Sequence, residues 1–181
     1  MKKLFALSVV LLSCAALSAQ TRYYGVDFSR TRVFGATETG YQFREVFGRI
    51  NSLVIAEWSK YDPGKFLSVD ITGRNISPTT RLNDDIDPAE VITHSSEYAI
   101  SPDQVADMVR RYELRESEGT GLVIVGEMLD KSTGMGSFLV VHFDVATREV
   151  LRSRGMVGKA RGFGLRNYWA GSLYEALSAS R

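Results

Sequence analysis

The sequence predicts an α/β (α+β) fold with a mixed, mostly antiparallel sheet, a C-terminal three-strand meander and about three flanking helices. Residues 122–129 and 137–145 are apolar at nearly every position and are joined by a short glycine-containing turn, which is typical of a central hairpin covered on both faces. Residues 41–58 instead carry apolar side chains at steps of three and four, which indicates an amphipathic helix. Helices of this kind are expected to lie on a face of the sheet.

The first half of the chain is expected to contain two strands, one helix and a long loop. Residues 23–28 alternate and are rich in strand formers, and residues 66–71 alternate in the same way. The helix over 41–58 is expected to end at the Asp-Pro-Gly turn of residues 61–65. The polar stretch 72–88 shows no period and predicts a loop, and long loops in compact domains are often functional.

The second half begins with an expected strand in residues 91–100. Ser101, Pro102 and Gln104 then form a strong helix start, because serine caps, proline suits the first turn and glutamine completes a capping box. After the central hairpin, a second tight turn leads into a third strand of the meander. Residues 167–179 predict a closing helix, since apolar side chains recur four apart.

The N-terminal residues predict export. Residues 1–19 combine two lysines, an apolar run and small residues, as in a secretory signal peptide, and residues 20–181 are expected to form a single α/β domain. The alternative is a lipobox-like reading of "LLSC", in which Cys14 is lipidated and anchors the protein to a membrane. Cleavage after Ala19 is favoured, and the expected location is the periplasm or the outer membrane.

The overall charge excludes some partners. The chain has 22 basic and 21 acidic residues, and this near-neutral balance argues against nucleic acid or an anionic membrane as partner. Membrane association is expected only if Cys14 is lipidated.

Residues 158–169, "GKARGFGLRNYW", resemble a ligand-binding glycine loop only in composition. Ala160 stands where a phosphate loop needs serine or threonine, and Asn167 stands where a dinucleotide fingerprint needs glycine. The stretch is interpreted as a strand passing to the last helix, with glycines that permit a bend and close helix packing. No cofactor is predicted.

Metal chemistry has two candidate residue sets. His142 and Asp144 share a face of one strand and could offer two ligands, although a hydrogen-bonded histidine on the sheet is favoured. Asp27, Asp70 and Asp144 follow or end expected strands and could together hold a magnesium ion for phosphoryl chemistry. Each of these aspartates also suits a local role in a turn, and the sequence favours a non-enzymatic protein.

Charge is segregated along the chain. Residues 84–118 contain ten acidic residues and three arginines, whereas the charged residues of 148–166 are all basic except Glu149. This pattern suits either an ordinary solvated surface or a complementary contact with an envelope protein or a second copy. The candidate partner-binding residues are Arg152, Arg154, Lys159, Arg161 and Arg166, and the loop 72–90 is expected to contribute to the partner surface as well.

Three segments carry a family resemblance: "GTGLVIVGEMLDK", "GSFLVVHFDVATREVL" and "GKARGFGLRNYWAGSLYEAL". They resemble small exported bacterial proteins of unknown function and envelope lipoproteins with α/β domains of the curli-transport and TolB amino-terminal type. The resemblance covers about half of the chain, and it implies a binding or assembly module without catalysis. It transfers no site residue.

Three functions therefore follow as hypotheses. The leading one is a non-enzymatic periplasmic or envelope-associated interaction module. The second is a metal-dependent phosphohydrolase that uses the three aspartates. The third is a carrier of a small apolar ligand, bound between the first helix and the sheet.

Overall fold

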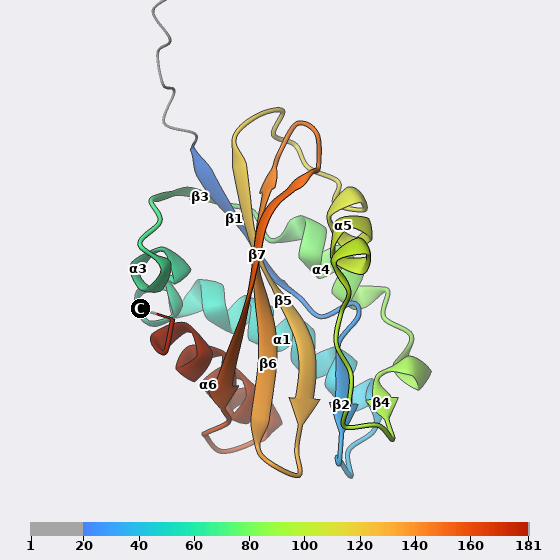
Figure 1. Cartoon of the computed structure of the whole chain (residues 1–181). Coiled ribbons are helices and arrows are strands. Elements are labelled where there is room, and N and C mark those ends of the chain that lie inside the picture. The colour runs from blue at the N-terminus through green and yellow to red at the C-terminus, as the bar shows by residue number, and fades with distance from the viewer. Residues whose placement is uncertain (1–19, 181) are drawn as a thin grey trace, which may run out of the picture.

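Seven strands form one sheet in residues 20–180, the part of the chain that the computed structural model describes (Figure 1). The predicted signal peptide of residues 1–19, with Cys14, lies outside the described residues. The strands are β1 Thr21–Asp27, β2 Arg32–Phe34, β3 Ile71–Arg74, β4 Ile92–Thr93, β5 Thr120–Asp130, β6 Met135–Asp144 and β7 Val150–Lys159. The helices are α1 Gly40–Ala56, α2 Trp58–Tyr61, α3 Pro63–Leu67, α4 Ser77–Asp84, α5 Pro102–Arg110 and α6 Leu165–Ser178, with a 3₁₀ turn η1 at Pro88–Glu90.

Strand β5 is the centre of the sheet. On one side it pairs with β1 along its first half and with β2 along its second half, and β3 and β4 lie outside β1 and β2. All four of these pairings are parallel. On its other side β5 pairs antiparallel with β6, and β6 pairs antiparallel with β7.

The predicted fold class is therefore wrong in its sheet: of the six strand pairings among the described residues, four are parallel, so the sheet is not mostly antiparallel. The physical reason is the helical connection between β1 and β3. A crossover through α1 brings the chain back to the same end of the sheet, and the next strand then runs parallel to the first. The prediction of about three helices was also too low, because α2, α3 and α4 were not expected.

Three sequence expectations in residues 61–100 are corrected. Residues 66–71 were predicted to be a strand, but α3 ends at Leu67 and β3 begins only at Ile71. The expected loop contains α4 and η1. The strand expected over 91–100 is limited to the two residues of β4.

Helices cover both faces of the sheet, in three layers (Figure 1). On one face α1 and α6 bury a large core that includes Phe43, Phe47 and Trp169. On the other face α5 and the chain that follows it bury a smaller core with Met108 and Tyr112. Both cores are dominated by aliphatic and aromatic side chains, whose removal from water is the main contribution to folding.

The long elements were predicted correctly. Helix α1 and the closing helix α6 lie where the apolar periodicity placed them. Helix α5 begins at the expected capping box, in which Ser101 accepts from the backbone of Gln104 and the Gln104 side chain accepts from Ser101. The apolar hairpin is β5–β6, at the centre of the sheet.

Candidate functional site

The three aspartates of the hydrolase hypothesis lie in different parts of the sheet. Thr120 of β5 pairs with both Thr21 and Asp144, so Asp144 lies level with the start of β1. Asp27 is at the other end of β1, about 20 Å further along at the usual rise of a strand. Asp27 and Asp144 therefore cannot share one metal ion.

Asp70 does not complete a metal site either. It directly precedes β3, whose first residue pairs with Thr21 at the sheet edge away from β6. Among the described residues, no three His, Cys, Asp or Glu side chains lie close enough to hold a metal ion together.

Asp144 has the local role in a turn that its sequence context suggested. Its Oδ1 accepts a 2.7 Å hydrogen bond from the backbone N–H of Thr147. That bond lowers the pKa of the Asp144 carboxyl, because it stabilises the ionised form. The carboxylate is thus engaged in the β6–β7 turn.

His142 lies opposite Arg152 in the β6–β7 ladder, on the face of the sheet that α6 covers. Burial and the positive charge of Arg152 both lower the pKa of His142, so the neutral imidazole is favoured. Its Nδ1 is buried without a hydrogen-bond partner among the described residues. At this nitrogen the structure shows no hydrogen bond of the kind expected for a histidine on the sheet.

Asp27 is fully buried at the carboxyl end of β1. Its Oδ1 accepts from the backbone N–H of Ser29, and its Oδ2 accepts a 2.8 Å hydrogen bond from the hydroxyl of Tyr112. Burial raises the pKa of Asp27 above its usual value, and these hydrogen bonds and the charge of Arg111 oppose the shift only in part. Asp27 therefore connects β1 to the segment after α5.

Three other buried polar side chains hold the same strand, and the sequence reasoning did not identify them. Asn83 accepts from the N–H of Phe28 and donates to the carbonyl of Val26, while Asn51 accepts from the N–H of Val26. Thr79 donates to the carbonyl of Tyr24. These side chains reach the backbone beside Gly25, where a Cβ would lie 2.7 Å from Asn51 and Thr79.

A sequence signal for one of them was present. Asn51 stands four residues after Phe47 in the apolar face of α1, and an amide in such a stripe needs a buried partner. The partner is a strand that bulges: the β1–β5 register shifts between Tyr23 and Val26, and Gly25 has a φ of +94°.

The five predicted partner-binding residues divide into two groups. Arg152 and Arg154 lie on the same face of β7, opposite His142 and Val140, and both are exposed, as is Lys159 at the end of the strand. Arg161 and Arg166 lie outside β7. The Arg161 Nε is 3.7 Å from Glu175 of α6, and the Arg166 Nε donates to Asn167.

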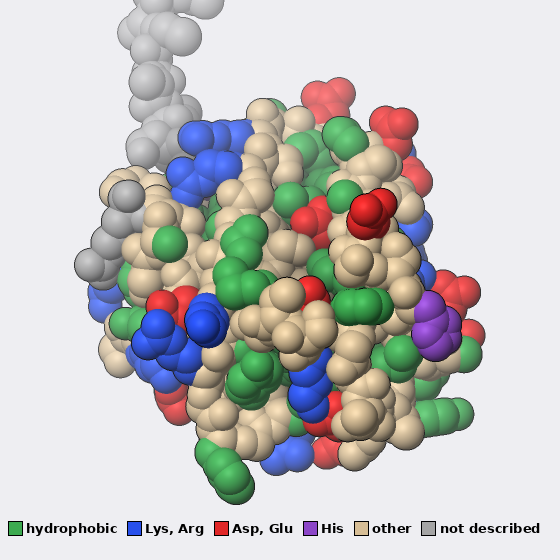
Figure 2. Space-filling view, turned by 60° about the horizontal axis from the view of Figure 1, so that its bottom comes forward, with side chains coloured by type: hydrophobic (Ala, Val, Ile, Leu, Met, Phe, Trp, Pro, Cys, Tyr) green, Lys and Arg blue, Asp and Glu red, His purple; other side chains and the backbone are tan. Residues whose placement is uncertain are grey.

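Charge is also separated in space. In Figure 2 the largest visible group of Lys and Arg side chains lies to the left, and most visible acidic side chains lie at the top and right. The acidic segment 84–118 lies to the right in Figure 1, and the two views differ only by a turn about the horizontal axis. The side of the molecule that carries the segment 84–118 is thus the side on which most of the visible acidic side chains lie.

Strand β7 is an open edge of the sheet. Within the described chain it pairs with β6 alone (Figure 1). Residues 151–155 are exposed, so neither face of this part of the strand is covered. Leu151 and Val157 are 58% and 53% exposed. A strand edge without a neighbour presents free backbone N–H and C=O groups.

The glycine-rich stretch 158–169 passes from β7 to α6, as expected. A Cβ on Gly158 would lie 2.0 Å from the carbonyl oxygen of Ser172 in α6, so glycine is needed for the helix to pack on the strand. Gly162 and Gly164 have φ values of +122° and +77°, which other residues rarely adopt, and they form the bend before α6.

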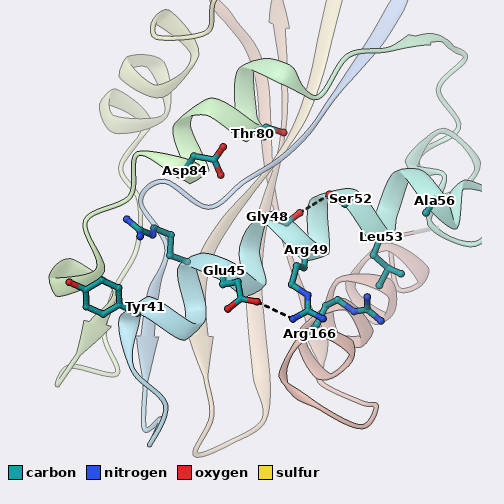
Figure 3. Close-up of a pocket in the computed structure, with 11 residues that line it drawn as sticks. Tyr41, Glu45, Gly48, Arg49, Ser52, Leu53, Ala56, Thr80, Asp84 and Arg166 are labelled. Carbon is teal, nitrogen blue, oxygen red and sulfur yellow. Dashed lines mark hydrogen bonds and ion pairs between the residues drawn. The ribbon is translucent and has the colours of Figure 1, made fainter.

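A large open groove lies on the outer side of α1, between α1 and α4 (Figure 3). Its lining combines apolar surface with charged side chains, among them Arg49 and Glu45, which form an ion pair. The space between α1 and the sheet is filled instead by aromatic packing, in which Phe28 and Phe47 stack with centroids 4.4 Å apart. This packing gives no support to an apolar ligand bound between helix and sheet.

None of the helices in the described residues is both long and apolar enough to span a bilayer. Comparison with protein-family models, curated proteins and solved structures finds no match to this chain.

Proposed function

We propose that this chain is a non-enzymatic, exported interaction module of the cell envelope, which binds an extended acidic segment of a partner protein along β7. The observation that carries the proposal is the open, exposed edge of β7. Export is supported by the sequence of residues 1–19.

The backbone of β7 suits the addition of a strand. Its register with β6 is continuous from Arg152 to Lys159, so the edge is held straight by the paired strand behind it. None of its ten residues is proline, and each therefore retains its N–H. In strand addition, main-chain hydrogen bonds provide affinity and alternating side chains provide specificity.

The side chains of β7 define the chemistry of the partner segment. Arg152 and Arg154 project from one face, and Val157 lies on the other face with Ser153 and Gly155. A Cβ on Gly155 would meet no atom within 4 Å, so a partner side chain has room there. The complementary segment carries acidic residues at alternate positions and apolar residues between them.

A second copy fits this edge less well. Antiparallel pairing of β7 with its own copy brings the arginines of the two strands onto one shared face, where like charges repel. The opposite edge of the sheet offers only the short strands β3 and β4. Repulsion between the arginines of two β7 strands therefore favours a partner protein whose sequence differs from this chain.

The surface proposed here excludes residues 72–90, which the sequence reasoning expected to contribute to the partner surface together with the basic stretch. Strand β3 lies at the opposite edge of the sheet, with β1, β5 and β6 between it and β7. Helix α4 packs on β1 and α1. One extended segment on β7 cannot reach them.

The test uses synthetic peptides of about eight residues, a common strand length. One alternates Glu with Val, one alternates Lys with Val, and one has the Glu–Val composition in scrambled order. Fluorescence anisotropy should show saturable binding of the alternating Glu–Val peptide alone. Equal binding of the scrambled peptide would show charge attraction without strand pairing and would contradict the proposal.

Paired charge reversals locate the binding site. Arg152→Glu with Arg154→Glu should weaken binding at least tenfold, since both cations facing the peptide are lost. Arg161→Glu with Arg166→Glu makes the same change in net charge away from β7 and serves as the matched control. Equal loss in both double variants, or sedimentation showing a dimer that the β7 variant abolishes, would overturn the choice of an acidic partner segment.

A further inference from the structure

A second cavity lies beyond the carboxyl end of β1, apart from β7. It has a volume of about 250 Å³, and its charged lining residues are Arg30, Arg32, Asp85, Asp87, Glu90 and Arg111. The chain leaves the sheet here: β1 ends at Asp27 and the sheet resumes with β2 at Arg32. In open α/β sheets, ligands bind outside the carboxyl ends of parallel strands.

Two arginines of this cavity have no carboxylate within ion-pair distance, although the charge of Arg111 acts on the buried carboxyl of Asp27. Neither Arg30 nor Arg111 forms an ion pair within the described residues, and the Nε of Arg30 is buried without a hydrogen-bond acceptor. A buried donor without a partner is costly, and such groups call for an explanation. An oxygen of a bound anion would supply the missing acceptor.

The third arginine and the acidic residues of the cavity are already engaged. Arg32 is 2.8 Å from Glu90, Asp85 lies 3.9 Å from Arg81, and the Oδ1 of Asp87 accepts from the N–H of Ala89. Arg30 and Arg111 are therefore the arginines of the cavity that form no ion pair within the described residues.

The position of Arg30 is fixed by its surroundings. The Tyr98 hydroxyl donates a 2.7 Å hydrogen bond to its carbonyl oxygen, and Thr31 donates its N–H to the carbonyl of Phe28 in the same turn. Arg111 directly precedes Tyr112, which is held by Asp27. Both arginines thus line the cavity from backbone that is held by hydrogen bonds, with the Arg111 side chain exposed, and guanidinium is well suited to bind carboxylate and phosphate oxygens.

We infer that Arg30 and Arg111 form a binding site for a small oxyanion, a carboxylate or phosphate group, in the cavity at the carboxyl end of β1. The site is independent of the strand-binding edge, because it involves neither β7 nor its neighbour β6. The proposed protein therefore has two separate binding sites, one for a partner segment at β7 and one for an oxyanion at the carboxyl end of β1.

Titration of the purified full chain with inorganic phosphate and with acetate tests the site, with backbone amide chemical shifts as the readout. We expect saturable shifts at Ser29, Arg30 and Arg111 with one or both anions, and none with sodium chloride at equal ionic strength. Saturation by phosphate alone identifies a tetrahedral anion, and saturation by acetate identifies a carboxylate. Absence of saturable shifts with both anions overturns the inference.

A double variant locates the binding. Arg30→Gln with Arg111→Gln should weaken the affinity at least tenfold, because both charge-assisted contacts are lost. The control is Arg49→Gln with Arg110→Gln, which removes two exposed arginines that pair with Glu45 and Asp107. Undiminished binding in the first variant, or equal loss in the control, contradicts the assignment. Anion affinity is measured without the peptide, so its failure leaves the β7 proposal intact.

Discussion

The hydroxyl of Tyr112 donates a 2.8 Å hydrogen bond to Oδ2 of Asp27, across 85 positions of the chain. Both residues are buried, and burial raises the pKa of each. A buried carboxyl of this kind binds its proton more tightly in the folded state than in the unfolded state. The pair therefore links stability to pH.

Replacement of Asp27 by Asn should change the pH dependence of stability. The pKa of an unfolded aspartate is about 3.9, and the pKa of Asp27 is higher in the folded state. Wild-type stability therefore contains a contribution that falls as pH rises between these two pKa values. The Asn variant lacks that contribution. Its free energy of unfolding, measured in urea, should therefore rise relative to wild type across this window.

Asp144→Asn provides a control of opposite sign. The pKa of Asp144 is lowered by its hydrogen bond from Thr147, so its contribution is present above the unfolded pKa and is lost as pH falls through the folded pKa. Relative to wild type, this variant should become less stable as pH rises. Curves that stay parallel to wild type for Asp27→Asn would contradict the assignment of a raised pKa.

Tyr112→Phe should destabilise the protein by about 1–3 kcal/mol at neutral pH, since the buried Asp27 carboxyl loses its hydrogen bond from Tyr112 and keeps that from Ser29. The apolar ring keeps its contact with Phe143. Chemical denaturation measures the change, and Tyr41→Phe is the control because Tyr41 is 70% exposed. A smaller loss at low pH, where Asp27 is protonated, is part of the expectation.

Asn83→Ala should cost about 3 kcal/mol. The side chain satisfies the N–H of Phe28 and the carbonyl of Val26, and each buried backbone group left without a partner costs about 1–3 kcal/mol. Asn167→Ala, at an exposed position, should change stability little. If both variants unfold at the same denaturant concentration, Asn83 does not hold the end of β1.

Prolines explain much of what the sequence reasoning missed in the first half of the chain. All four prolines lie in the first turn of a helix: Pro63, Pro78, Pro88 and Pro102. The start at Ser101-Pro102 was recognised. The same chemistry at Asp62-Pro63, where Asp62 accepts from the N–H of Gly64, was interpreted as a turn that ends a helix.

The parallel strand pairings could not be predicted from local sequence patterns. The pairing of β5 with β1 joins residues about 100 positions apart, and β1 carries a bulge at Gly25 that no alternation shows. The antiparallel hairpin is local and was predicted. For the site, Asp27 was identified as a residue of interest, but its partner Tyr112 comes from a helix end that only the fold brings near.

Gly48→Ala should stabilise the protein by up to about 1 kcal/mol. Gly48 lies in the middle of α1, and a Cβ there would meet no atom within 4 Å, so the substitution gains helix propensity without a clash. Thermal unfolding measures the gain. A loss of stability would show that this part of the groove beside α4 closes on the helix in solution.

Gly158→Ala should have the opposite effect and lower stability by about 1–3 kcal/mol, the usual cost of overpacking. The added Cβ would lie 2.0 Å from the Ser172 carbonyl oxygen and 2.4 Å from the Ala176 nitrogen, both on the backbone of α6. Because backbone cannot move aside as a side chain can, α6 must shift away from β7. Gly155→Ala on the same strand meets nothing within 4 Å and is the matched control. Equal unfolding midpoints for the two variants would mean that α6 does not pack on β7 as closely as this contact requires.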